Sequence, residues 1–474
     1  MRDMKQIFYA VIAMFAAIVA VGCEKERQTI IPPGSTMQYE PTKFETKKVD
    51  GVWKVLKDGE PFYINGAAAN NFYAEVDDWG GNVIRTYSTN ADTKALLDLA
   101  LANGVYVYMG LAMKDSESFD YSSTANEEAI REQFENHRSW VKRYKNHPAV
   151  FCWCIGNESE TGNATSNATY FKYVEEVAQM IHEEDPNHPT TVAFAGADPT
   201  NRIKVLIKHA PSIDFLSINQ YYNGVAGVSD KIKTASWGKP WVISEYGHRG
   251  TWNLSNGTDP RTLSWKSASG KVILEEMTST EKAAIYKSVW KNDIKAKESL
   301  GCIGSFIFLW GYQTHGEVLS WYGLFDKDKN SLGAVDEISA CWTGVAVENP
   351  APRIENRKKM KLNGETSAQT HSGSSWVGVT PLVKGTTGHT ATVEASSPAG
   401  VPLTYRWFIY KEGDASADGS IPDGIEGLIE DPTKATITFT APYAAGAYRL
   451  YVYAIDQTNK KVATACIPFL VEDK

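Results

Sequence analysis

The sequence predicts an α/β protein in which a (β/α)8 TIM barrel is followed by a C-terminal immunoglobulin-like β-sandwich. Three observations support this prediction. At 474 residues the chain is longer than one ordinary domain. Short apolar runs alternate with amphipathic helical patterns over roughly 250 residues of its middle section, the usual length of such a barrel. After Trp342 good helical patterns stop, and short alternating strands separated by turn residues follow.

Residues 1–23 are predicted to be a targeting segment. A basic start is followed by an uncharged apolar stretch at 7–21, which is too short to be a comfortable membrane span. This stretch ends in Ala20-Val21-Gly22-Cys23, which resembles a bacterial lipoprotein signal. We therefore expect an exported protein held at the outer membrane only by lipid on Cys23, with a polar tether at 24–38. An ordinary secretory signal with an incidental cysteine is the alternative.

The barrel domain is predicted at 39–346 and begins with a small hairpin at 47–58, whose turn is Asp50-Gly51. An open doubly wound sheet is the competing fold, but the sequence lacks the Gly-rich phosphate loop that its nucleotide-binding forms carry after the first strand. The eight barrel strands are expected at 62–65, 82–86, 105–111, 149–155, 191–194, 215–219, 241–245 and 302–309. The clearest helical patterns between them lie at 91–103, 127–144, 170–184 and 280–297.

Residues 347–371 are predicted to be a linker, because two prolines and a basic cluster lead into a Ser/Thr/Gly-rich run. The sandwich is expected at 372–474, with Trp407 in its core and Tyr448 in a tyrosine corner. We expect this domain to be a packing or spacer module outside the active site. Its predicted strands include 391–395, 403–410, 435–439 and 448–455.

Composition excludes several classes of partner. The net charge of −8 argues against nucleic acid and against anionic lipid surfaces. Apart from Cys23 the cysteines are odd in number and scattered, so they do not form a disulfide framework. The lone Cys152-Trp153-Cys154 lacks a second ligand pair for zinc, so both cysteines are expected to be buried small hydrophobic residues. The sequence indicates no metal and no cofactor.

Two glutamates stand at the carboxyl ends of predicted strands. The apolar run at 151–156 is followed by Asn157-Glu158, and the run at 241–244 is followed by Glu245. In a barrel of parallel strands the chemistry lies at that end. Two carboxyl groups about 5 Å apart can serve as acid/base and nucleophile of a retaining glycosidase. The pair therefore indicates glycoside hydrolysis, although either glutamate alone is also compatible with a helix cap or a salt bridge.

The segments Gly156-Asn157-Glu158 and Ser244-Glu245-Tyr246-Gly247 resemble glycoside hydrolase clan A. Similar segments on strands two, six and eight extend the likeness over most of the barrel. Within the clan, the local sequences look most like the family of β-galactosidases and β-glucuronidases. The two β-domains that normally precede the barrel there are absent, and the layout looks more like that of bacterial endo-β-1,3-glucanases.

The resemblance implies roles for individual residues. Glu158, at the end of strand four, corresponds to the acid/base, and Glu245, at the end of strand seven, to the nucleophile. Asn157 would hydrogen-bond the sugar 2-hydroxyl. Arg85 would hold Glu245 ionised, unless it forms only a structural ion pair.

Aromatic and histidine residues complete the expected site. Tyr221 is expected to hydrogen-bond Glu245, with Tyr222 as its competitor for that role. Trp310 is expected to form the floor under the sugar ring, with a core position as the alternative. Loops after strands seven and eight are expected to shape the substrate cleft, with His248, Trp252, Trp265, His315 and Trp321. The two histidines lack a third ligand at metal spacing.

The sequence thus predicts a retaining β-glycoside hydrolase with carbohydrate as its partner. An endo-β-glucanase acting on β-1,3-glucan is the first choice. The alternatives are an exo-β-glycosidase similar to β-galactosidases, a transglycosidase using the same residues, and a non-catalytic glycan-binding lipoprotein on a degenerate barrel.

Overall fold

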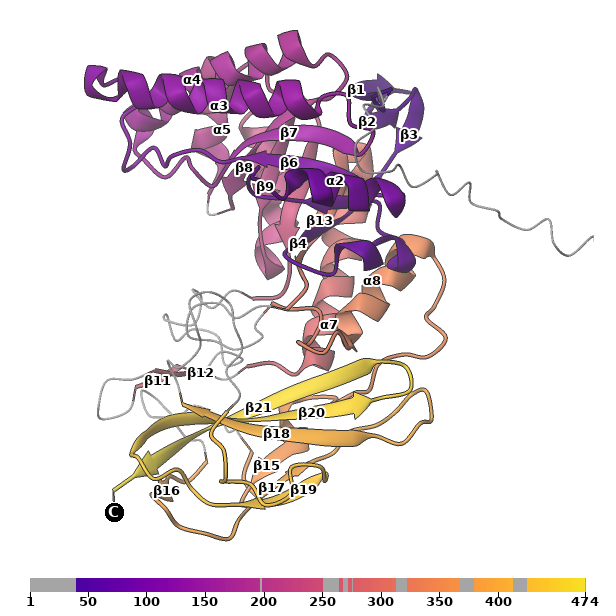
Figure 1. The fold of residues 1–474 in the computed structure, drawn as a ribbon, viewed down its shortest axis with the longest axis vertical. Coiled ribbons are helices and arrows are strands. Elements are labelled where there is room, and N and C mark those ends of the chain that lie inside the picture. Colours follow the sequence, from indigo (N-terminus) through magenta and orange to yellow (C-terminus); the bar gives the residue numbers. More distant parts are fainter. Residues whose placement is uncertain are drawn as a thin grey trace, which may run out of the picture. The chain divides into compact units, whose positions relative to one another are not determined.

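The computed structural model describes residues 40–196, 198–249, 264–266, 272–274, 276–312, 322–366, 379–411 and 424–473, with the backbone alone for 264–266 and 272–274. Residues 39–474 form one compact unit. Within it the described residues form a closed barrel surrounded by helices and, after it in the chain, two further sheets (Figure 1). The predicted signal, Cys23 and the tether lie outside the described residues.

Eight parallel strands close the barrel, which confirms the predicted barrel fold. The first strand differs most from its prediction at 62–65, because it begins at Ile64 and small residues extend its pairing to Ala68 with one neighbouring strand and to Ala69 with the other. In chain order the strands are β4 (Ile64–Ala69), β5 (Val83–Arg85), β6 (Tyr106–Leu111), β7 (Val150–Asn157), β8 (Thr190–Ala195), β9 (Phe215–Asn219), β10 (Trp241–Tyr246) and β13 (Cys302–Trp310).

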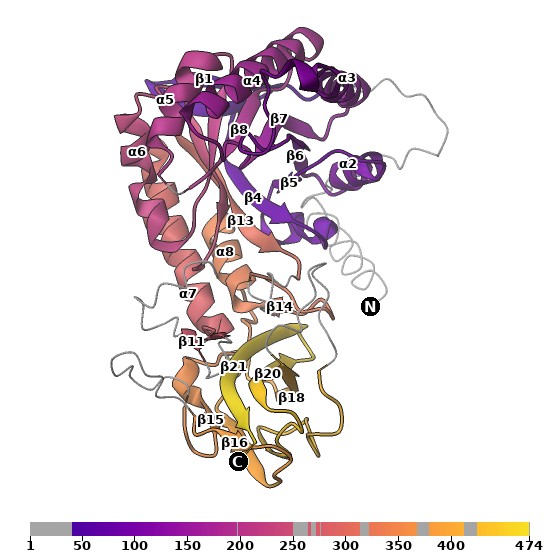
Figure 2. The ribbon, with the colours of Figure 1, turned by 90° about the vertical axis from the view of Figure 1, so that its left-hand side faces the viewer.

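Helices surround the barrel, as Figure 2 shows. Polar caps mark where two of them begin: the Asn163 side chain accepts from the backbone at the start of α4, and Thr278 and Glu281 form a capping box on α7. The α-helices are α2 (Thr93–Ala102), α3 (Glu127–Tyr144), α4 (Ala164–Glu184), α5 (Thr200–His209), α6 (Val228–Thr234), α7 (Ser279–Val289) and α8 (Gly333–Thr343). The short helical turns are η1 (Tyr73–Glu75), η2 (Asp77–Trp79), η3 (Thr124–Asn126), η4 (Tyr222–Gly227), η6 (Trp290–Ile294), η7 (Lys295–Leu300) and η8 (Arg357–Lys359).

The helix predicted at 280–297 is α-helical only as far as Val289, and the chain continues through the π-helical η6 and the 3-10 helix η7. Within the described ranges, no helix is both long enough and apolar enough to cross a membrane.

The amino end of the barrel is closed by the small N-terminal sheet. It consists of β1 (Phe44–Val49), β2 (Val52–Lys57) and β3 (Glu60–Phe62), and the predicted Asp50-Gly51 turn has positive φ at both residues. Phe44 and Val55 pack into the barrel interior with Phe151, Cys152 and Cys154. Both cysteines are buried, as predicted. Because the N-terminal sheet closes the amino end of the barrel, the site is expected at the carboxyl ends of the strands.

Two sheets with a shared apolar core form the C-terminal region, and one of them is antiparallel and the other mixed. Trp407 is buried in that core, and the Tyr448 hydroxyl donates to the Ala444 carbonyl at 2.8 Å, as a tyrosine corner would. The immunoglobulin-like assignment itself stays a prediction. The mixed sheet contains β14 (Ser331–Leu332), β16 (Leu382–Val383), β18 (Thr404–Lys411), β20 (Gly446–Asp456) and β21 (Lys461–Glu472). In this sheet β14 and β16 pair with β21 in parallel. The other contains β15 (Met360–Leu362), β17 (His389–Val393) and β19 (Thr436–Phe439), and a separate ribbon pairs β11 (Ser264–Lys266) with β12 (Val272–Leu274).

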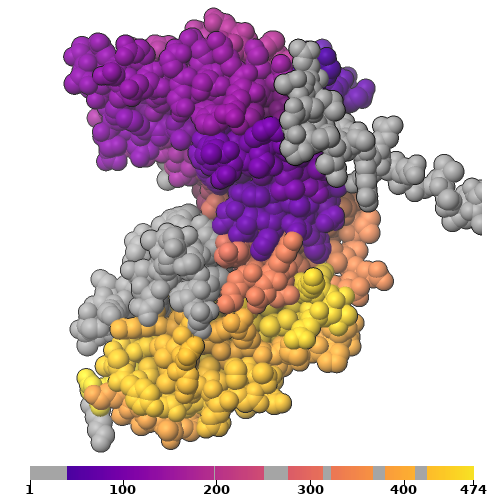
Figure 3. All heavy atoms as spheres, viewed as in Figure 1, coloured from indigo at the N-terminus to yellow at the C-terminus, as the bar shows by residue number. Residues whose placement is uncertain are grey.

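The linker predicted at 347–371 is wrong in its middle part. Ile354, Met360 and Leu362 are buried in the C-terminal core, and β15 pairs with β17. In addition β14, which precedes α8, pairs with β21. The C-terminal sheets are therefore built onto the last elements of the barrel domain, and Figure 3 shows the two regions in direct contact.

Candidate active site

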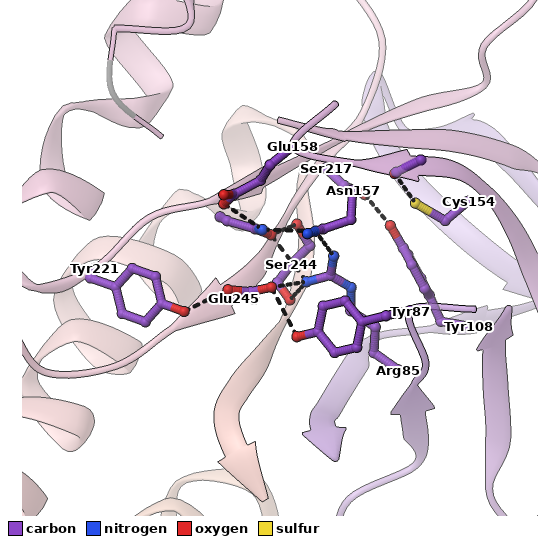
Figure 4. A network of polar contacts seen from close by, with 12 residues as sticks. Arg85, Tyr87, Tyr108, Cys154, Asn157, Glu158, Ser217, Tyr221, Ser244 and Glu245 are labelled. Atoms are coloured by element: carbon purple, nitrogen blue, oxygen red, sulfur yellow. Dashed lines mark hydrogen bonds and ion pairs between the residues drawn. The ribbon is translucent and has the colours of Figure 1, made fainter. Parts of the chain in front are cut away.

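Glu158 and Glu245 stand at the carboxyl ends of the fourth and seventh barrel strands, as predicted. Glu158 directly follows β7, and Glu245 is the last residue but one of β10. Their side chains take part in one polar network, which Figure 4 shows from close by. The barrel therefore brings the two predicted carboxyl groups into one site.

Glu245 is 6% exposed, and its carboxylate accepts hydrogen bonds from three donors. The Arg85 guanidinium and the Tyr87 hydroxyl donate to Oε1 at 2.9 and 2.8 Å. The Tyr221 hydroxyl donates to Oε2 at 2.5 Å, which decides the predicted competition with Tyr222 in favour of Tyr221. Charge-assisted bonds of this kind suit an anion held in a fixed orientation.

Arg85 is 1% exposed and links the parts of the site. Besides Glu245, it donates to the Ser244 carbonyl at 2.6 Å, to Asn219 Oδ1 at 3.0 Å and to Asn157 Oδ1 at 2.5 Å. The Tyr87 ring lies 4.5 Å from its guanidinium carbon. Arg85 thus pairs with Glu245 and at the same time fixes the amides of its two asparagine neighbours.

Glu158 has an environment different from that of Glu245. It is only partly buried, and its one hydrogen bond in the network comes from Asn219 Nδ2 at 2.8 Å. Burial raises the pKa of the Glu158 carboxyl, the nearby Glu245 charge raises it further, and Asn219 and Arg85 act in the opposite direction. A carboxyl group with a raised pKa is suited to donate a proton.

Asn157 is oriented by its neighbours. Its Oδ1 accepts from Arg85 and, at 3.0 Å, from Asn219 Nδ2. Its amide nitrogen has no hydrogen-bond partner among the described residues, so it is available to donate to a ligand hydroxyl.

Sequence reasoning missed Tyr87 and Asn219. Tyr87 lies two residues beyond β5, and Asn219 is the last residue of β9. Both therefore stand at the carboxyl ends of barrel strands, and the rule that selected the glutamates would have selected them too.

Trp310 and His248 do not line a substrate cleft, as they were predicted to do. Trp310 is fully buried, and its indole nitrogen donates to the Phe72 carbonyl at 3.0 Å. His248 is 1% exposed and packs against the rings of Tyr286 and Tyr322. Neither side chain presents a face to a substrate in this structure.

Phe308, two residues before Trp310, is the aromatic residue of β13 that lies beside the site. It is partly exposed, and its ring stands 5.8 Å from that of Tyr221. The remaining predicted cleft residues, Trp252, His315 and Trp321, lie outside the described residues, as does the side chain of Trp265.

The protein contains a barrel of parallel strands that carries a carboxyl pair at the ends of strands four and seven. Residues 84–273 match the family model described as glycosyl hydrolases family 2, TIM barrel domain. The predicted resemblance to clan A, and to the family of β-galactosidases and β-glucuronidases within it, is therefore confirmed over residues 84–273.

Curated relatives and solved structures are similar to parts of this chain. A β-glucuronidase of Streptococcus agalactiae serotype V is 26% identical over 239 residues, which are 41% of this chain and 37% of that protein. A mannan endo-1,4-β-mannosidase F of Aspergillus clavatus is 29% identical over 117 residues, or 22% of this chain and 26% of that protein. A crystal structure of Bacteroides uniformis β-glucuronidase covers 91% of this chain and 48% of its own, with 15% identity and a TM-score of 0.46. The chain thus spans well under two thirds of the length of the curated relatives that it matches.

Proposed function

We propose that this chain is a retaining β-glycoside hydrolase that acts by double displacement. The observation that carries the proposal is the contrast between two carboxyl groups of one network. Glu245 is held by Arg85, Tyr87 and Tyr221, as a nucleophile would be, whereas Glu158 has the raised pKa that an acid needs. The family 2 barrel match over 84–273 supports it.

In the first step Glu158 protonates the departing oxygen while a Glu245 oxygen attacks the anomeric carbon. The glycosyl–enzyme ester that forms leaves Glu245 without its charge. Because that charge raises the pKa of Glu158, esterification lowers it again. Glu158 can then take a proton from the water that attacks the anomeric carbon and releases Glu245.

The neighbouring residues support the charge changes of these steps. Arg85 and the two tyrosine hydroxyls stabilise Glu245 as it regains its charge. The Asn157 amide nitrogen would donate to the sugar 2-hydroxyl, a contact that strengthens in the transition state.

Retention is the first test of this mechanism. The two carboxyl groups are expected to lie about 5 to 5.5 Å apart, and a β-linked substrate should first release the β anomer. Proton NMR during the first minutes of hydrolysis, before mutarotation, measures this. An initial α anomer would show inversion and contradict the mechanism, and a lack of hydrolysis across a broad panel of β-glycosides would favour the glycan-binding alternative.

For the finer assignment the exo-β-glycosidase alternative has more support than the endo-β-1,3-glucanase. The β-glucuronidase relatives match about two fifths of the chain. The endo prediction relied on aromatic platforms along a groove, and one of them, Trp310, is buried. The similarity to a mannan endo-β-mannosidase keeps an endo-acting enzyme as the second candidate.

Product analysis separates the two candidates. An exo-acting enzyme should release monosaccharide alone from the outset and cleave at least one member of a panel of aryl β-glucuronides, β-galactosides and β-glucosides. An early ladder of oligosaccharides from a laminarin-type glucan or a mannan would instead establish endo action.

We also propose that the exported protein is anchored to the outer membrane by lipid on Cys23, as the signal-like sequence at 1–23 suggests. The C23S variant is then expected to leave the membrane fraction and appear in the soluble fraction, as detected by immunoblotting. Wild-type membrane association of C23S would contradict the anchor.

A further inference from the structure

A third carboxyl group, that of Glu160, lies two residues after Glu158 and was not predicted to have a role. Glu160 is 1% exposed, and its Oε1 accepts from the Ala195 backbone nitrogen at 2.9 Å and from Arg202 Nη1 at 2.7 Å. Arg202, on α5, also donates from Nη2 to the Ala195 carbonyl at 2.7 Å. Glu160, Arg202 and the last residue of β8 therefore close a ring of hydrogen bonds beside the site.

This ring fixes the segment that carries Glu158. Glu158 has a φ of 51°, a left-handed conformation that costs a non-glycine residue roughly 1 to 2 kcal/mol and must be held by its surroundings. The Glu158 nitrogen donates to the Ala193 carbonyl at 2.8 Å. Two residues further along both segments, the Glu160 side chain bonds Ala195, so it continues the attachment to β8 that the backbone began.

The other side of the segment is fixed as well. The Ser116 nitrogen donates to the Ser159 carbonyl at 2.8 Å, and the Gly162 nitrogen donates to Ser116 Oγ at 2.9 Å. Glu160 and Arg202 thus supply the attachment on the β8 side, where the amide of Asn219 also reaches Glu158.

We propose that Glu160 and Arg202 are positioning residues for Glu158, holding the acid/base in its left-handed conformation and balancing each other's charge beside it. The inference rests on the proposed function, because it assumes that Glu158 is the acid/base. Glu160 and Arg202 would act on Glu158 through the chain and through their charges. Neither residue lies within the network of Arg85, Tyr87, Tyr221 and Glu245.

The charges around the two glutamates determine the direction of the electrostatic effect. Glu158 faces Glu245 from β10, Arg85 from β5 and Arg202 from α5, and the arginines lower its pKa. Glu160 faces Glu158, Arg202 and the Tyr170 hydroxyl from α4. Burial raises the pKa of Glu160 to about 7, against the opposing effect of Arg202. Glu160 ionises as the pH rises through this range, and its ionised form offsets the Arg202 charge that Glu158 experiences.

The E160Q variant tests the proposal, because glutamine keeps the acceptor for Ala195 but loses the charge. The probes are the 4-nitrophenyl and unsubstituted phenyl β-glycosides of the sugar that the wild type cleaves best. For the phenyl glycoside, whose poor leaving group needs a proton, kcat/KM is expected to fall about tenfold or more. For the nitrophenyl glycoside it should change much less. The alkaline limb of the pH profile should move to lower pH, because the uncompensated Arg202 lowers the pKa of Glu158.

The R202M variant should shift the same limb to higher pH, since it removes a cation that lowers the pKa of Glu158. The opposite directions separate a charge effect from a general loss of structure, and R202M also serves as the test if E160Q fails to fold. The matched control is E175Q, because Glu175 likewise anchors a backbone nitrogen, that of Ser212, but does so from α4 toward the segment before β9. Its pH profile and leaving-group dependence should equal those of the wild type.

An unchanged alkaline limb and unchanged leaving-group dependence in folded E160Q, or in R202M, would overturn the inference. The E158A variant keeps that outcome distinct from failure of the proposed function. If E158A loses activity on phenyl glycosides while E160Q and R202M behave as wild type, only the positioning role fails. If E158A retains wild-type activity, the proposed function itself fails.

Discussion

Replacing Glu245 by glycine is expected to abolish hydrolysis of β-glycosides, with a loss in kcat of at least about 10⁴-fold. The variant removes the atom that attacks the anomeric carbon, so no glycosyl–enzyme ester can form. The donors Arg85, Tyr87 and Tyr221 remain, and they border the space left by the missing carboxyethyl side chain. Azide, a small anion, should bind there and attack in place of the carboxylate.

The measurement is the initial rate on an activated nitrophenyl β-glycoside with and without azide, together with NMR of the product. The expected product is a glycosyl azide of inverted, α configuration, because only one displacement now occurs. Rescue without a glycosyl azide, or wild-type activity of E245G, would show that Glu245 is not the nucleophile.

E158A is the complementary variant. It should form the glycosyl–enzyme at a useful rate from substrates with good leaving groups, which need no proton, and fail on polysaccharide. Burst kinetics with a nitrophenyl glycoside measure this difference. Equal losses on both kinds of substrate would contradict the acid/base role of Glu158.

The barrel and its carboxyl pair could be predicted because the signals for both are local. Each buried parallel strand is a short apolar run, and the residue that follows the run lies at the catalytic end. Glu158 and Glu245 follow their runs directly. The same rule places Asn219 at the catalytic end, but its role depends on contacts with Asn157, Glu158 and Arg85 on or next to other strands, which the sequence does not reveal.

The direction of the Trp310 side chain could not be read from alternation along β13. The pairing of β13 with β4 shifts register between Phe308 and Trp310, so the two-residue period does not hold across this point. As a result Phe308 stands beside Tyr221, while Trp310 packs against Phe325 in the core outside the barrel.

The extent of the linker was misjudged for a different reason. Prolines and basic residues surround the three residues of β15, so the local composition indicates an irregular segment. The strand is specified by non-local pairing with β17 and by burial of Met360 and Leu362, neither of which composition reveals.

The contact between the C-terminal sheets and the barrel domain rests in part on a buried ion pair. Lys461 Nζ, at the start of β21, lies 2.7 Å from Asp336 Oδ1 on α8, and both residues are less than a tenth exposed. Asp336 Oδ2 accepts from the Ala351 nitrogen at 2.6 Å. Removing one partner of such a pair leaves a buried charge without compensation, which typically costs about 3 to 5 kcal/mol.

K461M is therefore expected to lower the free energy of unfolding by about 3 kcal/mol or more at neutral pH, as measured by urea denaturation. The effect should depend on pH. Burial raises the pKa of Asp336 in the folded protein above its usual value, and Lys461 opposes that rise. In K461M the pKa rises further, so protonation of Asp336 favours the folded variant, and the gap to the wild type should shrink as the pH falls through this raised pKa.

The matched control is K384M, because Lys384 pairs with Asp473 at a similar distance of 2.6 Å in the same region but on the exposed surface. Its stability should barely change, since exposed ion pairs contribute little. The double variant K461M/D336N should recover part of the loss, because it removes the stranded carboxylate. If K461M were no less stable than K384M, or if its deficit grew on acidification, the ion pair would not be what holds the C-terminal sheets against α8.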